Sequence, residues 1–356
     1  MSQQEHQFWQ LPAPNARGSF DSLALQTGPT PKPGPGEVLV AVKAASLNFR
    51  DLIIALGKYP LDKKDAPTIP ASDGAGEVVA VGEGVTKFKP KDRVAAIFNA
   101  GHQRGSTPNR AEKRTGLGGS IDGMLSQYRA LPETALVHIP QHLSWEEAAT
   151  LPCAAVTAWN GLFGLPSNVL QPGETVVCEG TGGVSVFGAQ FAIAAGAKVV
   201  ITSSSDEKLD RVRKLFSQEK QALLTTVNYK TNPDWDKEVL KVSGEEGAAH
   251  VLDVGGPGTL EKAFNTIRPG GVVSDIGFVG KGEVPNLSAL VLGTTSVYRG
   301  ILVGSREMFE QMNAAIDVHK LKPLVDKVFD WKDAKKAYEY QWSGSHAGKV
   351  VIRIGS

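Results

Sequence analysis

The sequence has few cysteines, no long apolar run and no surplus of charge. Its 356 residues include two cysteines, Cys153 and Cys178, which are too few for a disulfide framework. No apolar run approaches the roughly 18–20 residues that a membrane-spanning helix requires, and the polar N-terminus lacks a signal-peptide core. Basic and acidic residues number 38 and 37, so composition gives no reason to expect a nucleic-acid or membrane partner. We therefore expect a cytoplasmic protein.

The length suits two domains of about 100–200 residues each, and the pattern of elements changes near residue 151. Before this point the chain is predicted to be mostly β, and the polar, aperiodic stretch 99–119 predicts an exposed loop. After it, strands and helices alternate, which predicts a parallel sheet with helices on both faces. The expected strands are Val38–Ala44, Gly76–Val81, Arg93–Phe98, Thr175–Cys178, Lys198–Thr202, Ala222–Asn228, His250–Val254, Gly271–Ile276 and Gly348–Ile354. The expected helices of the second half are Val184–Ala195, Asp206–Phe216, Pro233–Val242 and Thr259–Thr266.

The segment 176–185, V-V-C-E-G-T-G-G-V-S, is the most informative stretch. An apolar strand leads into a glycine turn, and a helix pattern follows. Such a turn brings backbone N–H groups close to a pyrophosphate at the helix N-terminus. Ser185 stands where the fingerprint G-x-G-x-x-G would have its third glycine. The residues that this turn offers to a nucleotide are Gly180, Thr181, Gly182, Gly183 and Val184.

Several segments then occur in collinear order over nearly the whole chain. They are G-E-V-L-V-A-V-K-A-A-S-L-N-F-R-D-L (36–52), I-P-A-S-D-G-A-G-E-V-V-A-V-G (69–82), D-R-V (92–94), L-P-C-A-A-V-T-A-W (151–159), G-T-G-G-V-S (180–185), L-D-V-G-G (252–256) and G-K-V-V-I (348–352). Together they resemble the medium-chain dehydrogenase/reductase superfamily, and within it the zinc-free, quinone-oxidoreductase-like branch.

The resemblance implies an α/β fold in two parts. Residues 1–150, completed by 305–356, would form a GroES-like β-barrel catalytic domain. Residues 151–304 would form a Rossmann domain with a doubly wound parallel sheet that binds the cofactor, and the active site would lie in the cleft. The family is often dimeric, so we expect a homodimer. The apolar stretch Leu290–Val303 could supply an edge strand for pairing, although a buried intrachain strand would look identical.

The zinc-dependent members of the superfamily use a thiolate, a histidine and a second thiolate as ligands. At the corresponding positions this chain has Asn48, Ser72 and Cys153. The stretch 99–119 contains no cysteine either, so the four-cysteine structural zinc lobe is missing. We therefore predict no zinc. The histidines other than His6 are interpreted as surface or turn residues.

Without zinc, nothing obvious polarises an alcohol for oxidation. This favours the reduction of an activated acceptor, a quinone or an α,β-unsaturated carbonyl, because the developing enolate or phenolate needs only hydrogen-bond donors. The resemblance points to Asn48 and Tyr59 as catalytic residues, with Asn48 a neutral donor and Tyr59 a donor or proton source. Asp51 would anchor its loop, and Arg50 is assigned no catalytic role.

The cofactor is predicted to be NADPH. An NAD-binding fold carries an acid at the end of its second strand, where this chain has Ser203 and Ser204. Lys208 would supply positive charge to the 2′-phosphate, and Tyr229 matches a family tyrosine beside it. Towards the nicotinamide we expect four further residues, Thr157, Gly255, Gly277 and Phe278. Lys349 resembles a family lysine near the cofactor phosphates, although an outward-facing strand lysine would fit the pattern as well.

Two other functions remain open. An enoyl-thioester reductase of fatty-acid or polyketide synthesis would share the chemistry, and the basic residues of 99–119 could contact its carrier arm. The simpler interpretation of those residues is a solvated loop. A non-catalytic NADPH-binding sensor is the second alternative, because fold alone does not establish turnover.

Overall fold

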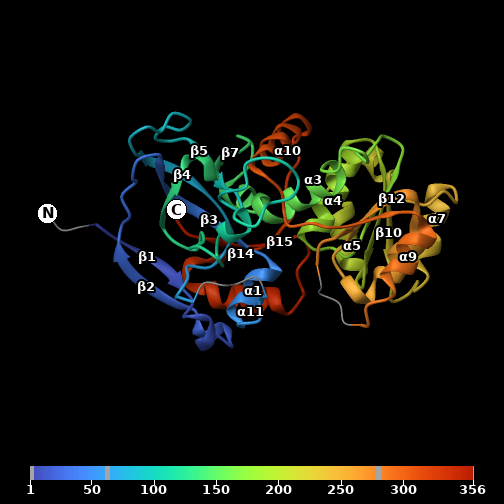
Figure 1. Ribbon diagram of the computed structural model, residues 1–356, viewed down its shortest axis with the longest axis horizontal. Helices are drawn as coiled ribbons and strands as arrows, with labels where there is room; N and C mark the ends of the chain where they lie inside the picture. Colours follow the sequence, from blue (N-terminus) through green and yellow to red (C-terminus); the bar gives the residue numbers. More distant parts are fainter. Residues whose placement is uncertain (1–3, 61–64, 278–281, 356) are drawn as a thin grey trace. The chain divides into compact units, whose positions relative to one another are not determined.

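The computed structural model describes residues 4–60, 65–277 and 282–355. The chain divides into two compact units, Met1–Val156 with Ser305–Ser356, and Thr157–Gly304. The second unit thus begins a few residues after the change in pattern near residue 151. Figure 1 shows the course of the chain through both.

The first unit is built on a largely antiparallel sheet. Its strands run in the order β14-β15-β3-β4-β5-β7, and β6 also pairs with β3. The strands are β3 (Glu37–Leu47), β4 (Asp73–Val81), β5 (Arg93–Ala96), β6 (Tyr128–Pro132), β7 (Leu136–His138), β14 (Val325–Asp330) and β15 (Lys349–Arg353). A separate antiparallel pair consists of β1 (Glu5–Gln10) and β2 (Ala24–Pro29). The C-terminal segment therefore completes a sheet that the first 150 residues begin.

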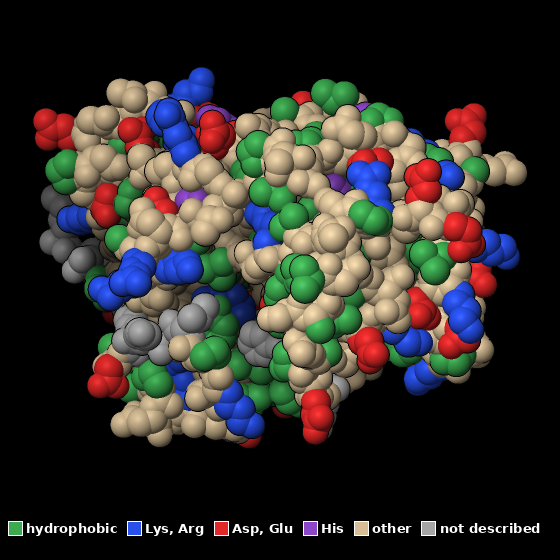
Figure 2. All heavy atoms as spheres, turned by 45° about the vertical axis from the view of Figure 1, so that its right-hand side comes forward, with side chains coloured by type: hydrophobic (Ala, Val, Ile, Leu, Met, Phe, Trp, Pro, Cys, Tyr) green, Lys and Arg blue, Asp and Glu red, His purple; other side chains and the backbone are tan. Residues whose placement is uncertain are grey.

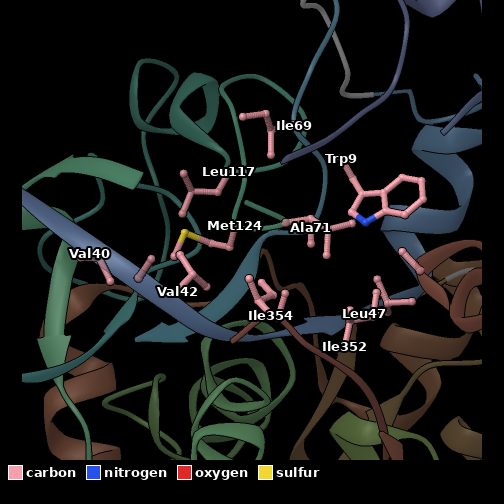
Figure 3. Close-up of a cluster of buried hydrophobic side chains, with 14 of the residues drawn as sticks. Trp9, Val40, Val42, Leu47, Ile69, Ala71, Leu117, Met124, Ile352 and Ile354 are labelled. Carbon is pink, nitrogen blue, oxygen red and sulfur yellow. The ribbon is translucent and has the colours of Figure 1, made fainter. Parts of the chain in front are cut away.

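The core of this unit lies against β3 and β15. Alternate residues of β3, among them Val40 and Val42, turn inward together with Ile352 of β15 and Ile354 just after it, as Figure 3 shows. Four α-helices belong to the described part of this unit. They are α1 (Phe49–Ala55), α2 (Trp145–Ala148), α10 (Arg306–His319) and α11 (Ala334–Trp342).

The second unit is a six-stranded parallel sheet in the order β10-β9-β8-β11-β12-β13. The chain starts in the middle, moves outward to β10, and then returns to build the other half, which is the order of a Rossmann fold. The strands are β8 (Thr175–Cys178), β9 (Lys198–Ser203), β10 (Leu224–Asn228), β11 (Ala248–Asp253), β12 (Ile267–Asp275) and β13 (Val297–Gly300). The helices are α3 (Val156–Phe163), α4 (Gly183–Ala194), α5 (Asp206–Arg213), α6 (Gln218–Gln221), α7 (Trp235–Ser243), α8 (Leu260–Thr266) and α9 (Leu287–Thr294). The expected parallel sheet is confirmed.

Close packing against this sheet depends on two helical glycines. A Cβ atom on Gly188 of α4 would lie 2.4 Å from Cδ1 of Leu252, and one on Gly161 of α3 would lie 2.5 Å from its Cδ2. Leu252 is fully buried in β11, so it is held between the two helices. Ser185 is tolerated in the fingerprint because its hydroxyl donates to the Glu179 carbonyl at 2.5 Å.

Two expectations about exposure were wrong, and one of two alternatives is excluded. The stretch 99–119 is not exposed throughout, because Asn99, His102 and Leu117 are buried. His102 and His250 are not surface histidines, and His250 lies inside β11. Of the two alternatives for Lys349, the outward-facing lysine is excluded, because the residue is buried. Apolar neighbours on both faces of a strand, or a loop that folds back on the core, bury polar residues that sequence alone would place outside.

Both signs of charge are spread over the face of the molecule in Figure 2. Among the residues described, no helix has the length and apolar character needed to cross a bilayer.

Candidate functional site

Three strand ends meet at one point of the first unit. β3 runs antiparallel to both β4 and β15, with Ser46 opposite Asp73 and Leu47 opposite Val350. The end of β3 therefore adjoins the beginnings of β4 and β15. This register brings together Asn48, Asp73 and Lys349, which lie far apart in the sequence.

A network of polar contacts joins these residues. The Lys349 ammonium donates to the carbonyl of Leu47 at 2.6 Å and to Oδ1 of Asn48. Nδ2 of Asn48 donates to the Ser72 hydroxyl at 3.4 Å, which in turn donates to Oδ1 of Asp73 at 2.7 Å. The backbone N–H of Cys153 donates to Oδ2 of Asp73 at 3.2 Å. We call Asn48, Ser72, Asp73, Cys153 and Lys349 the strand-end cluster.

The strand-end cluster is buried and contains one ion pair. Lys349 is 4% exposed, Asp73 is fully buried, and Lys349 Nζ lies 3.9 Å from Asp73 Oδ2. Burial raises the pKa of Asp73, and the ammonium opposes that rise. Burial also raises the pKa of the Cys153 thiol, and the neighbouring Asp73 raises it further. Cys153 is therefore a neutral thiol at physiological pH. It lies in a π-helical turn, Leu151–Ala155, a feature that is frequent at functional sites.

Helix α1 carries a second charged pair beside the cluster. Asp51 accepts from the backbone N–H of Asn48 at 2.7 Å and lies 3.4 Å from the Arg50 guanidinium. It anchors the start of α1, as expected. Burial raises the pKa of Asp51 to about 6, against the opposing charge of Arg50.

The Arg50 guanidinium is fixed among aromatic rings. It lies 4.6 Å from the ring centre of Phe98 and 5.2 Å from that of Tyr59, and it donates to the carbonyl of Leu117 at 2.9 Å. Its Nε is buried without a hydrogen-bond partner. Tyr59 thus lies beside the fixed positive charge of Arg50, which is two residues from Asn48 in the sequence. The contact of Arg50 with these two rings depends on the folding of distant loops and was not expected from sequence.

In the second unit, the turn after β8 has the geometry of a phosphate site. Gly180 has a φ of +76°, and a Cβ on Gly180 or Gly182 would meet nothing within 4 Å. Helix α4 begins at Gly183 with no side chain capping its first N–H groups. Free N–H groups at a helix N-terminus bind phosphate groups well. Thr181 and Val184 lie in the same turn, and Oγ1 of Thr181 is 3.4 Å from Oγ of Ser203.

Ser203 ends β9, the neighbouring strand. Its hydroxyl accepts from the N–H of Ser205 at 3.3 Å, and its carbonyl accepts from the N–H of Tyr229 at 3.0 Å. The Ser205 hydroxyl caps α5 through the N–H of Lys208. The structure therefore brings Ser203, Ser204, Lys208 and Tyr229 to one edge of the sheet.

The remaining predicted residues follow other elements. Thr157 is buried in α3, Gly255 follows β11 and Gly277 follows β12. Phe278 lies outside the described residues. A Cβ on Gly255 would lie 2.4 Å from Oγ1 of Thr259, so only glycine fits there.

One pair of acids at this edge was not predicted as a pair. Glu179 directly follows β8 and Asp253 ends β11; both are buried, and the two carboxyl groups face each other. Asp253 orients the loop that follows it, because Oδ1 accepts from the N–H of Gly256 at 2.8 Å and the hydroxyl of Thr259 at 2.9 Å. Burial and the facing Asp253 raise the pKa of Glu179 well above its ordinary value. One of the two carboxyl groups therefore keeps its proton.

Comparison with known proteins decides the family. Residues 34–141 match the alcohol dehydrogenase GroES-like domain, and residues 183–317 match the zinc-binding dehydrogenase domain. A zinc-type alcohol dehydrogenase-like protein of Schizosaccharomyces pombe is 48% identical over 94% of this chain and 96% of its own length. The chain belongs to the medium-chain dehydrogenase/reductase superfamily.

Other members of the superfamily are similar over the whole chain. An acryloyl-coenzyme A reductase of Metallosphaera sedula is 30% identical over 90% of this chain and 93% of its own. The crystal structure of a putative alcohol dehydrogenase from Sinorhizobium meliloti is 36% identical and superimposes with a TM-score of 0.86 over 99% of this chain and all of that one. The GroES-like and Rossmann architecture is thereby confirmed, and the chain is an oxidoreductase of this superfamily.

The residues of the strand-end cluster do not fit a zinc ion. Zinc requires thiolate, imidazole or carboxylate ligands in tetrahedral arrangement, whereas the positions compared above hold a carboxamide, a hydroxyl and a neutral thiol. The Lys349 ammonium binds the Asn48 oxygen instead. Within the described ranges no three His, Cys, Asp or Glu side chains are grouped to hold a metal ion.

Sequence reasoning missed Asp73, and it considered Lys349 for the cofactor phosphates or the strand surface and not for this cluster. Asp73 and Lys349 each stand beside a residue of a recognised motif, but their meeting depends on the register of β4 and β15 against β3. The acid next to Ser72 in the segment A-S-D-G was the one available signal.

Proposed function

We propose that the chain is a zinc-independent, NADPH-dependent reductase of a quinone or an α,β-unsaturated carbonyl compound. The observation that carries the proposal is the donor set of the strand-end cluster. It offers hydrogen-bond donors and a buried ammonium, and no set of ligands for a metal. Such a site suits an acceptor whose oxygen gains negative charge during reduction.

The chain's own residues have distinct roles in this proposal. Asn48 donates an N–H to the acceptor's carbonyl oxygen as charge develops on it, and Tyr59 supplies a proton to the reduced product. Arg50 holds Tyr59 in a positive environment. When bound, the dinucleotide supplies the hydride; the turn Gly180–Val184 would bind its pyrophosphate.

The preference for NADPH rests on the end of β9. Ser203 stands where NAD-binding folds place an acid, so no carboxylate there would repel a 2′-phosphate. The Ser203 and Ser204 hydroxyls and the Lys208 ammonium would bind that phosphate. Asp206 and Glu207 are exposed in the first turn of α5, where acids suit the helix dipole.

The test is NADPH oxidation with a panel of acceptors, namely a benzoquinone, a naphthoquinone, a simple enone and an enoyl thioester, with NADH as control. Turnover of a quinone or the enone with NADPH preferred supports the proposal. Cofactor binding without turnover of any acceptor would favour the sensor and contradict it.

An enoyl-thioester reductase is the second candidate. The acryloyl-coenzyme A reductase of M. sedula reduces a thioester by its name, and four basic side chains of the stretch 99–119 are exposed: Arg104, Arg110, Lys113 and Arg114. These residues would attract the phosphates of a thioester carrier. This candidate would be favoured if the KM for the thioester rises with salt concentration and also rises when these four basic residues are replaced by neutral ones.

We further propose a cytoplasmic homodimer that pairs through β13. This strand is the last of its sheet, and Leu292 of the preceding helix is 79% exposed. Unpaired strand edges and exposed apolar side chains are typical of such interfaces. Sedimentation of a Leu292→Glu variant as a monomer, with the wild type dimeric, is the expected result; a monomeric wild type would refute the dimer.

A further inference from the structure

Lys349 is a buried cation whose closest partners are neutral. Its ammonium donates to the Leu47 carbonyl and the Asn48 carboxamide, while Asp73 lies farther away at 3.9 Å. Both Asp73 oxygens already accept hydrogen bonds, from the Ser72 hydroxyl and the Cys153 N–H. The ammonium therefore acts mainly on Asn48, and Asp73 balances its charge at a distance.

This contact fixes which way the Asn48 carboxamide faces. An ammonium carries three donors and no acceptor, so the atom that it touches is the carboxamide oxygen. The NH2 group must then lie on the opposite side, where it faces the Ser72 hydroxyl at 3.4 Å and the Asp73 carboxylate. An acceptor oxygen would take the place of the long contact with Ser72. Without the contact with Lys349, the asparagine could present either its oxygen or its nitrogen.

The same contact strengthens the donor. Withdrawal of electron density through the carboxamide oxygen by a cation makes the N–H groups at its other end more positive, and chains of hydrogen bonds in a buried site reinforce one another. A donor that is both oriented in advance and polarised suits an oxygen that becomes negative in the transition state.

We propose that Lys349 is a positioning residue that locks Asn48 as a hydrogen-bond donor for the acceptor oxygen. This inference rests on the reductase function proposed above. It differs from the alternative in which Lys349 binds the cofactor phosphates, because it predicts an effect on turnover and none on cofactor affinity.

A double-mutant cycle tests the proposal. Lys349→Met, Asn48→Ala and the double variant are compared by kcat for acceptor reduction and by the Kd of NADPH. Asn48→Ala should lower kcat by about a hundredfold, in the range for loss of an oxyanion donor. Lys349→Met should lower it by roughly ten- to a hundredfold, as loss of an outer-shell partner does elsewhere. The double variant should be no slower than Asn48→Ala, and every Kd should stay within about threefold of wild type.

The matched control is Lys336→Met, which removes an exposed lysine paired with Asp333 at 2.8 Å and should leave kcat unchanged. Losses that multiply in the double variant would overturn the proposal, because Lys349 would then act independently of Asn48. A Kd for NADPH raised tenfold or more in Lys349→Met would overturn it in favour of phosphate binding.

A second readout does not need turnover. With 15N-labelled asparagine, the NH2 signals that vanish in Asn48→Ala identify Asn48. In wild type they should be a sharp pair protected from exchange with water, and in Lys349→Met they should broaden or exchange faster. Unchanged signals in Lys349→Met would refute the proposal that Lys349 holds the Asn48 carboxamide in place. If wild type reduces no acceptor, the proposed function fails while this measurement still decides the role of Lys349.

Discussion

At the scale of single residues, Ser203 is expected to decide between the two nicotinamide cofactors. A Ser203→Asp substitution places a carboxylate at the end of β9, where it would repel a 2′-phosphate and accept from ribose hydroxyls. We predict that the ratio of NADPH to NADH affinity falls at least about tenfold, a change of about 1.4 kcal/mol. Fluorescence titration with both cofactors measures it. Ser217→Asp, an equal charge change at the exposed N-cap of α6, is the control; equal shifts in the two variants would contradict the assignment.

His250 makes the stability of the second unit depend on pH. Burial lowers its pKa to about 4 in the fold, whereas the unfolded value is about 6.5. Between these values the unfolded chain binds a proton that the folded chain does not, so the free energy of unfolding falls as the pH is lowered. From pH 7 to pH 5 this loss should be about 2 kcal/mol. Urea unfolding of His250→Asn should show a correspondingly smaller pH dependence, with the exposed His319→Asn as control; identical pH dependence in wild type and His250→Asn would contradict it.

Residue types predicted some of these positions and not others. The glycine turn and Ser203 could be predicted because a strand, a turn and a helix are contiguous in sequence. Lys349 could not, because a lysine at the start of a strand is ordinarily exposed. Its burial depends on β15 lying between β14 and β3.

At the scale of elements, the contact of α4 with the sheet depends on Gly188. Alanine is the better helix former by about 1 kcal/mol, yet its Cβ would collide with the Leu252 side chain. That side chain has little room to move, because α3 packs against it at Gly161. We predict that Gly188→Ala destabilises the protein by about 1–3 kcal/mol through overpacking. Gly244→Ala, at a left-handed helix end with open space around it, is a control for backbone effects alone. A more stable Gly188→Ala protein would show that the sheet and helix are not in close contact there.

The ends of β8 and β11 carry the acid pair Glu179 and Asp253. Burial raises the pKa of both carboxyl groups. At a pH above the ordinary carboxyl pKa, the folded chain therefore retains a proton that the unfolded chain has released. The free energy of unfolding should therefore decline as the pH rises above the ordinary carboxyl pKa. Glu179→Gln removes the titration, so its Tm should exceed that of wild type at pH 8 and the difference should shrink towards pH 5. A Tm difference independent of pH would contradict the shared proton.

Elements were predicted well where their periodicity was strong. The five strands of the second unit expected from sequence all occur, and the sixth, β13, falls within the stretch expected to provide an edge. The loop 99–119 was misjudged because polar residues such as Asn99 and His102 fold back into the first unit. No local sequence pattern predicts that a polar loop is partly buried.

At the scale of the whole molecule, membership of the superfamily establishes an oxidoreductase, while the residues of the strand-end cluster are the basis for proposing that it works without zinc. The names of its relatives refer to zinc, and the residues of the cluster do not supply its ligands. Such a difference between family name and site is possible because one fold can carry different sites.

The most direct test of the account is the zinc content of purified protein measured together with its rate of NADPH-dependent reduction, before and after prolonged treatment with a strong chelator. The account predicts less than one zinc per ten chains and an unchanged rate after treatment. About one zinc per chain, with the rate lost on chelation and restored by added zinc, would contradict it.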